Sequence, residues 1–340
     1  MRYSALNLRE ISHPPCVTHP GMGLTWSRAP EELLNGSLPG PDTSHWFMRG
    51  LPRPNGVGHA AHRREVPGRR TFNPGVAQWQ GQTLLACRVG KGNVSGVWTG
   101  QLDGKLMPIR QSFVEVLPYY EGESFEDPRL VVFNDRLFLS CAVARAAGTS
   151  QCLMEIGRGL RAKSFREIAS PSKVKFEKNW IFFAHGRRLN FIYHAGRGWH
   201  EIYAMSRGGA APAWRSRNRM NWQWGEIRGG TNAVLADGQY WTFFHSQHRY
   251  PREWRYFMGA YSFEARPPFR ITAYTPMPLY TPPAPSQSHL PLDVKHVIFP
   301  SGLLKVGEEW LIFSGYNDER VVVSRISHAK LRDLMVGAEN

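Results

Sequence analysis

The sequence predicts an all-β protein, and within that class a five-bladed β-propeller, because one strand–turn–strand unit recurs at a blade-like spacing. Each unit has an apolar strand, a tight turn and a second apolar strand, and the units occupy residues 76–89, 130–143, 180–194, 233–246 and 303–316. The turn centres lie 54, 51, 52 and 69 residues apart and are Gly81, Asp135, Gly186, Gly238 and Gly307. Repeats of about 40–50 residues built from strands are typical of propeller blades. Helix patterns are confined to two short segments, 29–34 and 329–336.

The repeats also divide the chain. We expect residues 1–70, which are rich in Pro, Gly, His and Arg, to form loops and a strand that closes the ring. Residues 71–325 would form the five-bladed catalytic propeller, and residues 326–340 a C-terminal tail with a short helix. The longest spacing contains a Pro-rich insertion at 275–291, which is expected to be an ordered surface loop. One propeller therefore accounts for the 340 residues.

The composition narrows the range of partners. A net charge of +15 favours an anionic partner. Three classes of partner are possible: nucleic acid, an anionic membrane surface, or a phosphate-bearing substrate. No zinc-finger or RNA-binding motif is present, so no nucleic-acid partner is predicted. No apolar run approaches the ~20 residues of a membrane span. The N-terminus lacks an apolar signal region, so a cytoplasmic location is expected. Homo-oligomerisation is left open.

The four cysteines, Cys16, Cys87, Cys141 and Cys152, do not have the spacing of metal ligands. No metal or other cofactor is therefore predicted. Cys87 and Cys141 fall inside predicted strands, where we expect them to be buried thiols.

The most distinctive motif is Glu126-Asp127-Pro128-Arg129, which runs directly into the second hairpin. Because Pro128 fixes the local backbone, Asp127 and Arg129 are presented at the start of a strand. A surface Asp–Arg pair that stabilises a turn would contribute little. A general acid, in contrast, would need an Asp whose pKa is raised by a confined, partly dry site.

Polar residues recur at equivalent positions of the repeats. Eight positions before the turn centres lie Asn73, Asp127, Lys178, Gly230 and Phe299. Seven positions after them lie Arg88, Ala142, Tyr193, His245 and Ser314. A propeller brings equivalent blade positions together around one axis, so we expect these residues to line one polar funnel.

Two further stretches have a composition suited to ligands. Segment 208–224 is rich in residues that stack on sugar rings or bind anions, although interface packing explains them equally well: Trp214, Arg215, Arg217, Arg219, Trp222 and Trp224. The adjacent Gly229 and Gly230 would let the backbone approach a ligand closely. Arg228 and His245 would form an anion clamp.

Over residues 70–325 the chain resembles glycoside hydrolase family 130, the β-mannoside phosphorylases and mannosidases, and the related β-1,2-mannosyltransferases. The motifs that carry the resemblance are Glu126-Asp127-Pro128-Arg129, Asn73-Pro74, Lys178-Asn179, Gly229-Gly230-Thr231, His245 and Gly315-Tyr316-Asn317-Asp318. The resemblance implies that Asp127 is the proton donor. It implies a sugar-binding set of Asn73, Arg88, Glu126, Arg129, Asn179, Tyr316 and Asp318. It implies a phosphate-binding set of Lys178, Arg228 and His245.

Our first interpretation is an inverting glycoside phosphorylase that converts a β-mannoside and phosphate to mannose 1-phosphate, because such an enzyme needs one carboxylic acid and an anion clamp. The alternative is a β-mannosyltransferase that uses GDP-mannose. A hydrolase would need a second carboxylate to activate water, for which Glu177 and Glu226 are the candidates. A non-catalytic glycan-binding propeller is the remaining alternative.

The chain departs from the family pattern after the third hairpin. Family phosphorylases carry an Arg after the His that ends this hairpin, whereas this sequence has His194-Ala195. Arg187, Arg188 and Arg197 are the candidates to replace the missing arginine. The departure favours a funnel that holds the diphosphate of a sugar nucleotide over one that holds free phosphate.

Overall fold

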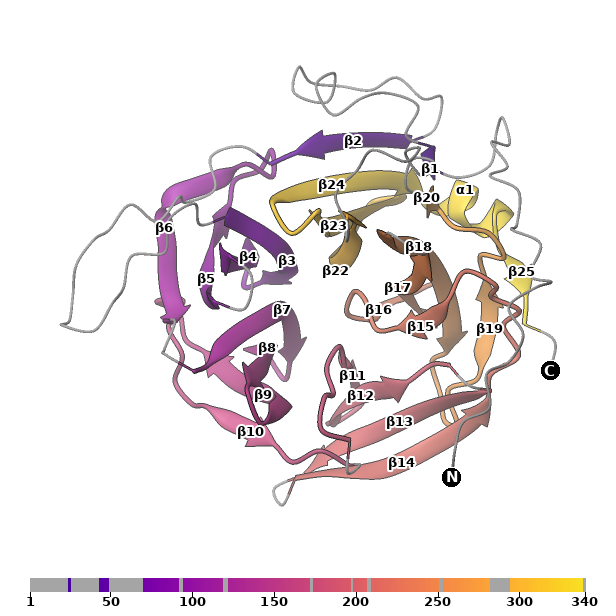
Figure 1. The fold of residues 1–340 in the computed structure, drawn as a ribbon, viewed down its shortest axis with the longest axis horizontal. Helices are drawn as coiled ribbons and strands as arrows, with labels where there is room; N and C mark the ends of the chain where they lie inside the picture. Colours follow the sequence, from indigo (N-terminus) through magenta and orange to yellow (C-terminus); the bar gives the residue numbers. More distant parts are fainter. Residues whose placement is uncertain are drawn as a thin grey trace.

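In the computed structural model, five β-sheets surround one axis as the blades of a propeller, which confirms the predicted fold (Figure 1). The structure describes residues 24–25, 43–48, 70–91, 94–118, 122–171, 174–196, 198–206, 209–250, 253–281 and 294–338. The helix expected at 29–34, residue Cys16 and most of the Pro-rich insertion lie outside these ranges.

The first three blades are four-stranded antiparallel sheets whose strands run in sequence order from the axis outward, so the last strand of each blade is outermost. Blade one contains β3 (Arg70–Trp79), β4 (Gln82–Lys91), β5 (Val94–Leu102) and β6 (Pro108–Leu117). Blade two contains β7 (Ser124–Phe133), β8 (Arg136–Arg145), β9 (Gly148–Ile156) and β10 (Arg166–Ile168). Blade three contains β11 (Ile181–His185), β12 (Arg188–His194), β13 (Trp199–Ser206) and β14 (Gly209–Arg217). Strands β3, β7 and β11 face the axis (Figure 1).

Blade four is larger because short strands from distant parts of the chain extend its sheet. Its main strands are β15 (Glu226–Arg228), β16 (Val234–Ala236), β17 (Gln239–Tyr250), β18 (Glu253–Glu264) and β19 (Ile271–Tyr274). The added strands are β1 (Leu24–Thr25), β20 (Tyr280–Thr281), β21 (Val294–His296) and β25 (Val336–Gly337).

Blade five combines three consecutive strands with one strand from much earlier in the sequence. Its inner strands are β22 (Ile298–Val306), β23 (Glu309–Tyr316) and β24 (Arg320–Ser327). Its outer strand is β2 (Thr43–Phe47), which pairs antiparallel with β24. Pairing β2 with β24 covers a sheet edge that would otherwise be open, and it closes the ring.

All five predicted turns lie between the two strands where they were expected. Their central residues take positive φ values between 54° and 75°: Gly81, Asp135, Gly186, Gly238 and Gly307. Gly and Asp tolerate this left-handed conformation better than most residues, which explains why the turns could be recognised in the sequence.

The core consists of five apolar clusters, each between two neighbouring blades. Aromatic side chains dominate, and Trp180 and Trp310 are fully buried. The polar groups of other aromatic side chains form hydrogen bonds across blade boundaries. Trp79 Nε1 donates to Asp135 O at 2.8 Å, and Tyr240 Oη donates to Ala184 O at 2.6 Å. Blade packing therefore fixes the relative positions of the inner strands that carry the polar residues.

The chain after the last blade forms the helix α1 and the strand β25, and β25 pairs with β19 of blade four. Helix α1 (His328–Asp333) begins at Ser327, whose Oγ accepts a hydrogen bond from Lys330 N at 3.1 Å. The helix is shorter than the 329–336 expected, because residues 336–337 form β25 instead. No helix in the described part of the chain has the length and apolar character needed to cross a membrane. The thiols of Cys87 and Cys141 are buried, as expected.

Candidate active site

A residue with left-handed backbone lies in, or just before, the inner strand of each of the first three blades. Asn73, Asp127 and Asn179 have φ values of 47°, 54° and 70°, in the left-handed region. In blades one and two these residues lie in β-bulges, between Phe72 and Gly75 and between Glu126 and Arg129. A bulge redirects a side chain out of the strand alternation, and here the redirected side chains meet one another.

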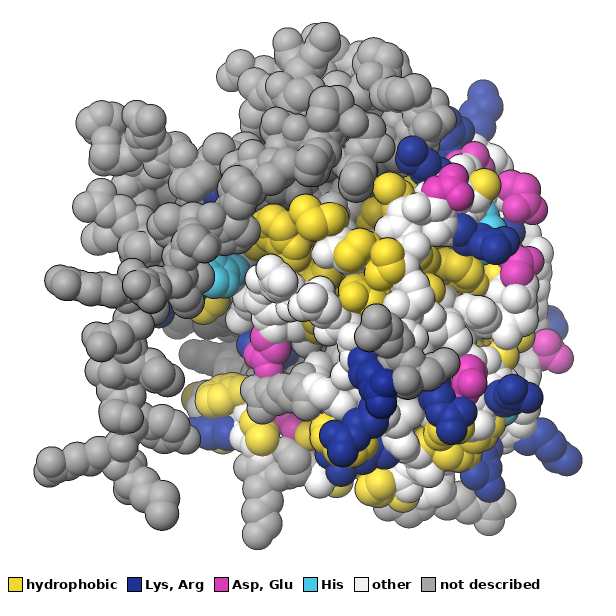
Figure 2. All heavy atoms as spheres, turned by 90° about the vertical axis from the view of Figure 1, so that its right-hand side faces the viewer, with side chains coloured by type: hydrophobic (Ala, Val, Ile, Leu, Met, Phe, Trp, Pro, Cys, Tyr) yellow, Lys and Arg dark blue, Asp and Glu magenta, His cyan; other side chains and the backbone are white. Residues whose placement is uncertain are grey.

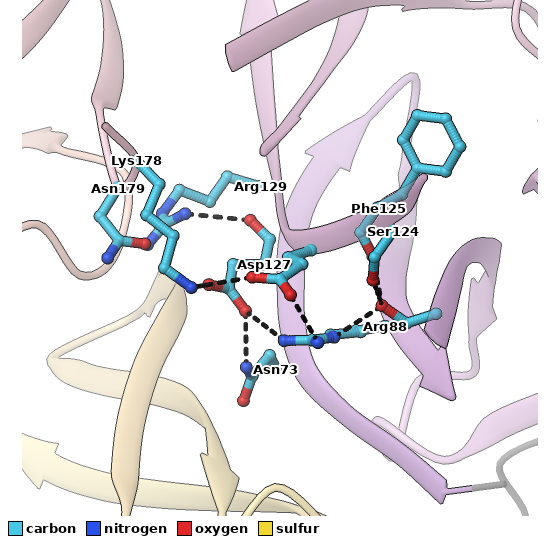
Figure 3. Close-up of polar contacts among 10 residues, drawn as sticks. Asn73, Arg88, Ser124, Phe125, Asp127, Arg129, Lys178 and Asn179 are labelled. Atoms are coloured by element: carbon cyan, nitrogen blue, oxygen red, sulfur yellow. Dashed lines mark hydrogen bonds and ion pairs between the residues drawn. The ribbon is translucent and has the colours of Figure 1, made fainter. Parts of the chain in front are cut away.

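Asp127 lies at the centre of this meeting point (Figure 3). Its Oδ1 accepts hydrogen bonds from Asn73 Nδ2 at 2.7 Å and from Arg88 Nη1 at 3.4 Å. Its Oδ2 accepts from Lys178 Nζ at 3.2 Å. The residue is 2% exposed, so this carboxylate depends on its protein partners rather than on water.

Glu126 lies beside Asp127 and shares both of its cationic partners. Glu126 Oε1 accepts from Arg88 Nη2 at 2.9 Å, and Oε2 accepts from Lys178 Nζ at 2.9 Å. Arg88 is held in turn by Ser95, whose Oγ accepts from Arg88 Nε at 2.9 Å. Ser95 Oγ also lies 2.7 Å from Ser124 Oγ. Blades one, two and three thus contribute to a single charged network.

Arg129 crosses beneath this network and is 1% exposed. Its Nη1 donates to Asp127 O at 3.0 Å, its Nη2 to Asn179 Oδ1 at 3.3 Å, and its Nε to Gly230 O at 2.6 Å. These bonds connect blades two, three and four. They favour a positioning role for Arg129 over direct contact with a sugar.

The electrostatics of Asp127 differ from the expectation of a raised pKa. Burial acts to raise the pKa, but the charges of Lys178, Arg88 and Arg129, together with the hydrogen bond from Asn73, hold it well below the usual range of an aspartate. Burial would also favour a neutral Lys178, but Asp127 and Glu126 outweigh it and raise the pKa of Lys178. Asp127 is therefore a carboxylate and Lys178 an ammonium at neutral pH.

The proposed anion clamp lies on blade four. Arg228 and His245 are directly opposite each other in the pairing of β15 with β17. Arg228 Nη2 lies 3.3 Å from Glu226 Oε2, and its side chain is 40% exposed. His245 is buried and stacks on Tyr256 with ring centroids 5.6 Å apart. Burial, and then the charges of Arg129 and Arg228, lower the pKa of His245 to about 3, so its ring is neutral at neutral pH.

The sequence and the fold were compared with known proteins. No protein-family model matches the sequence, and no curated protein matches it. Solved structures do match. One is the β-1,2-mannobiose phosphorylase from Listeria innocua in complex with β-1,2-mannobiose, at 14% identity and a TM-score of 0.55, over 80% of this chain and 94% of that one. Another comes from glycoside hydrolase family 130, described as mannoside phosphorylases that include hydrolases of β-1,2-mannosidic linkages. Its sequence identity is 14% and its TM-score 0.57, over 80% of this chain and 87% of that one.

The chain shares its fold with glycoside hydrolase family 130. A third match is a GDP-Man-dependent mannosyltransferase from Leishmania mexicana, at 12% identity and a TM-score of 0.54, over 83% of this chain and 89% of that one. Phosphorylase, hydrolase and transferase structures therefore all share the family 130 fold with this chain. The fold alone does not distinguish among these activities.

Hydrogen bonds and ion pairs connect most of the predicted site residues, but not all of them. Asn73, Arg88, Glu126, Asp127, Arg129, Lys178 and Asn179 form the connected network described above. Asp318 lies in the β23–β24 turn with a φ of 53°, close enough to Tyr256 to influence its pKa. Tyr316 is different, because its hydroxyl pairs with Tyr280 and its ring packs against the cluster between blades four and five.

Two of the candidates to replace the missing arginine are in the wrong place. Arg187 and Arg188 lie at the β11–β12 turn, whereas Ala195 follows the opposite end of β12. Seven residues of strand separate these ends by roughly 20 Å. Arg197 lies outside the described residues. Ala195 itself is buried, and its carbonyl accepts a hydrogen bond from Asn218 Nδ2 at 2.7 Å.

Packing within the propeller requires glycine at both of the adjacent positions 229 and 230. A Cβ on Gly229 would lie 1.8 Å from Asn179 O, and a Cβ on Gly230 would lie 2.1 Å from Phe243 O. The glycines therefore allow close packing within blade four and against blade three. Approach to a ligand is not needed to explain them.

The tryptophans and arginines of segment 208–224 belong mainly to the blade surfaces. Trp214, Trp222 and Trp224 pack on Phe269, Phe244 and Phe257, respectively. Arg215 and Arg217 lie over the ring of Trp199, at 3.7 and 4.0 Å from its centroid. Figure 2 shows Lys and Arg side chains on the face that it presents, both in its lower half and toward its upper right. Much of the positive charge is thus on the outside of the propeller.

Sequence reasoning missed Tyr256 and Ser95. Tyr256 lies on β18, where Lys178, Asp318, Arg228 and Asp127 all influence its pKa after the larger effect of burial, which raises it. Each residue lies on the strand that follows the hairpin of its blade, β5 for Ser95 and β18 for Tyr256, outside the hairpins whose positions were compared. Among the described residues, no group of three His, Cys, Asp or Glu side chains could hold a metal ion.

Proposed function

We propose that the protein is a carbohydrate-active enzyme that forms β-mannosidic bonds with inversion, by transferring a mannosyl group from a phosphate-activated donor to a sugar hydroxyl. The observation that carries this proposal is the carboxylate of Asp127, buried among Lys178, Arg88 and Asn73. A carboxylate in this setting has no proton to donate to a leaving group. It can accept one from an attacking hydroxyl.

The proton and electron balance follows from this role. The acceptor oxygen attacks the anomeric carbon while its proton passes to Asp127, and the bond from that carbon to the phosphate oxygen breaks. The phosphate leaves with the electron pair, so it needs cations and no proton. Arg228 and Lys178 are cationic, and neutral His245 can donate one hydrogen bond. One carboxylate and one anion site are sufficient for inversion.

The expected phosphorolysis is the same reaction in reverse, and it would require Asp127 to be protonated first. Asp127, ion-paired with Lys178 and Arg88, is in the carboxylate state from which the synthetic direction starts. The hydrolytic alternative has less support, because Glu177 accepts hydrogen bonds from Ser170 and Tyr193, and Glu226 pairs with Arg228. The matched phosphorylase and mannosyltransferase structures support the choice of a mannosyl group.

Turnover with two donors tests the proposal. Purified protein is incubated with acceptor sugars and either mannose 1-phosphate or GDP-mannose, and released phosphate or GDP is measured. Release from either donor, lost in Asp127→Asn, is the expected result. Full turnover in Asp127→Asn would overturn the role of this residue. Binding of glycans with no turnover from either donor would favour a non-catalytic propeller.

A further inference from the structure

Ser95 lies near the start of β5 in blade one, is 1% exposed, and connects this blade to blade two. Its Oγ donates to Phe125 O at 2.8 Å, accepts from Arg88 Nε at 2.9 Å, and lies 2.7 Å from Ser124 Oγ. A serine hydroxyl has one hydrogen to donate and two lone pairs that accept. Because the hydrogen goes to Phe125, Ser124 is the donor in the contact between the two hydroxyls. The Ser95 hydroxyl is therefore fully bonded and held in one orientation.

The backbone also holds Ser95 close to Arg88. Gly90 lies directly opposite Ser95 in the pairing of β4 with β5, and a Cβ on Gly90 would lie 2.5 Å from Ser95 Cβ. Glycine in a strand often marks a site where another part of the backbone approaches closely. Arg88 is two residues before Gly90 on β4, so the sheet itself brings the guanidinium to the hydroxyl of Ser95.

Arg88 donates from its three nitrogens to three different residues (Figure 3). Its Nε donates to Ser95, its Nη1 to Asp127 Oδ1 at 3.4 Å, and its Nη2 to Glu126 Oε1 at 2.9 Å. Nε and Nη2 form one edge of the guanidinium, and the two oxygens of a carboxylate can accept from both nitrogens of such an edge. Glu126 takes one position on this edge, and Ser95 takes the other.

The second oxygen of Glu126 is consequently available to Lys178. Glu126 Oε2 accepts from Lys178 Nζ at 2.9 Å, and the same ammonium donates to Asp127 Oδ2 at 3.2 Å. Without the hydroxyl of Ser95, both oxygens of Glu126 could bond to the open edge of Arg88, which is a stronger arrangement than a single hydrogen bond. Lys178 would then lose its bond with Glu126 and move closer to Asp127.

We propose that Ser95 is a positioning residue of the active site, because it holds Arg88 in the orientation that shares both cations between the two carboxylates. This role rests on the proposed function, in which Asp127 accepts the proton of the acceptor hydroxyl. Sharing keeps Lys178 from closing onto Asp127, whose carboxylate then stays in the position from which it accepts the proton. A displacement of about 1 Å between reacting groups can cost on the order of 10²-fold in rate.

Turnover of Ser95→Ala tests this role, with Thr99→Val as the matched control. Thr99 lies on the same strand, is 1% exposed, and donates from its Oγ1 to Leu160 O at 2.8 Å. Both variants therefore lose one buried hydroxyl that bonds to a backbone carbonyl, but only the first loses a bond to Arg88. We expect the kcat of Ser95→Ala to fall by ~10–100-fold and that of Thr99→Val to stay close to the wild-type value.

The Arg88→Lys background separates positioning from general packing. Lysine keeps the positive charge, but it has no guanidinium edge for Ser95 to occupy. Ser95→Ala should therefore cost little further turnover in that background. A packing defect would instead lower turnover by the same factor in both backgrounds, because effects of independent origin multiply.

Crystal structures of the wild type and Ser95→Ala give a readout that does not depend on turnover. In the variant, we expect Nε and Nη2 of Arg88 both to bond to Glu126, and Lys178 to have moved away from Glu126. An Arg88 that keeps its wild-type contacts with Glu126 and Asp127 would overturn the inference.

Three kinetic results would also overturn it: a wild-type kcat in Ser95→Ala, equal losses in Ser95→Ala and Thr99→Val, or an undiminished effect of Ser95→Ala in the Arg88→Lys background. Failure of the proposed function is recognised separately. If the wild-type protein transfers from neither donor, the proposed function is overturned, and the two crystal structures then decide whether Ser95 holds Arg88.

Discussion

Lys178 Nζ lies 3.2 Å from Asp127 Oδ2, so the third blade supplies a cation to a carboxylate of the second. The same ammonium lies 2.9 Å from Glu126 Oε2. Its side chain is 37% exposed, whereas that of Asp127 is 2% exposed. Lys178 therefore lies where a substrate could reach it, and Asp127 lies just behind.

Replacing Asp127 with Asn should abolish turnover without unfolding the protein. Asn keeps the shape and the hydrogen bond with Asn73, but it cannot take a proton from the acceptor. We expect turnover to fall by ~10²–10⁴-fold. The variant should also melt at a lower temperature, because Lys178 and Arg88 lose an anionic partner. Turnover and thermal melting of the variant check both effects, with Glu264→Gln as the control, because Glu264 pairs with Arg270 on the β18–β19 hairpin.

Replacing Lys178 with Met should change the pH profile of turnover. Loss of the ammonium removes charge that stabilises the carboxylate, so the pKa of Asp127 rises. The deprotonated form is the active one, and the acid limb of the kcat/KM profile should therefore move to higher pH. Lys163→Met serves as the control, because Lys163 pairs with Glu155 at the surface. An acid limb in the same place in both variants would contradict the assignment.

Gly229→Ala should destabilise the propeller. The new Cβ would lie 1.8 Å from Asn179 O, a backbone atom that cannot move aside without shifting blade three. Overpacking of this kind costs about 1–3 kcal/mol of the free energy of unfolding. Gly104→Ala is the matched control, since nothing lies within 4 Å of its Cβ. Chemical denaturation of the two variants gives the comparison, and equal stability would disprove the close approach.

The protein should lose stability as the pH falls from about 6.5 to about 4, and His200 is one cause. Burial lowers the pKa of His200 to about 4, against the hydrogen bond of its Nδ1 with Phe269 O at 2.8 Å. The unfolded chain binds a proton at its ordinary pKa near 6.5, whereas the folded protein does not until about 4. The stabilisation is therefore present above 6.5 and is lost across this window, by up to roughly 3 kcal/mol.

Urea denaturation at pH 7 and pH 4.5 measures this loss. His200→Gln should be less stable than the wild type at pH 7, but its stability should change less between the two pH values. His185→Gln is a suitable comparison, because His185 is only partly buried. An equal pH dependence in the wild type and His200→Gln would rule out the contribution of this residue.

Local signals predicted the fold, because each blade begins with a hairpin whose turn needs a left-handed residue. Comparison of equivalent positions then found Asn73, Asp127 and Lys178, since propeller symmetry brings such positions together. It could not find Tyr256, which lies on a strand outside the compared hairpins. Nor could it find the charge state of Asp127, which depends on cations from three different blades, Arg88, Arg129 and Lys178. The family resemblance placed Tyr316 in the sugar-binding set, but its ring packs against the core cluster between blades four and five.

The pairing of β2 with β24 has a consequence for how the protein is made. Thr43 pairs with Ile326, so β2 leaves the ribosome long before its partner strand β24. The ring cannot close until β24 has been synthesised. Blades one to three, whose strands are continuous in sequence, can form during translation, and completion of the fifth blade comes afterwards. The residues around Asp127 are therefore enclosed by all five blades only after β2 has paired with β24.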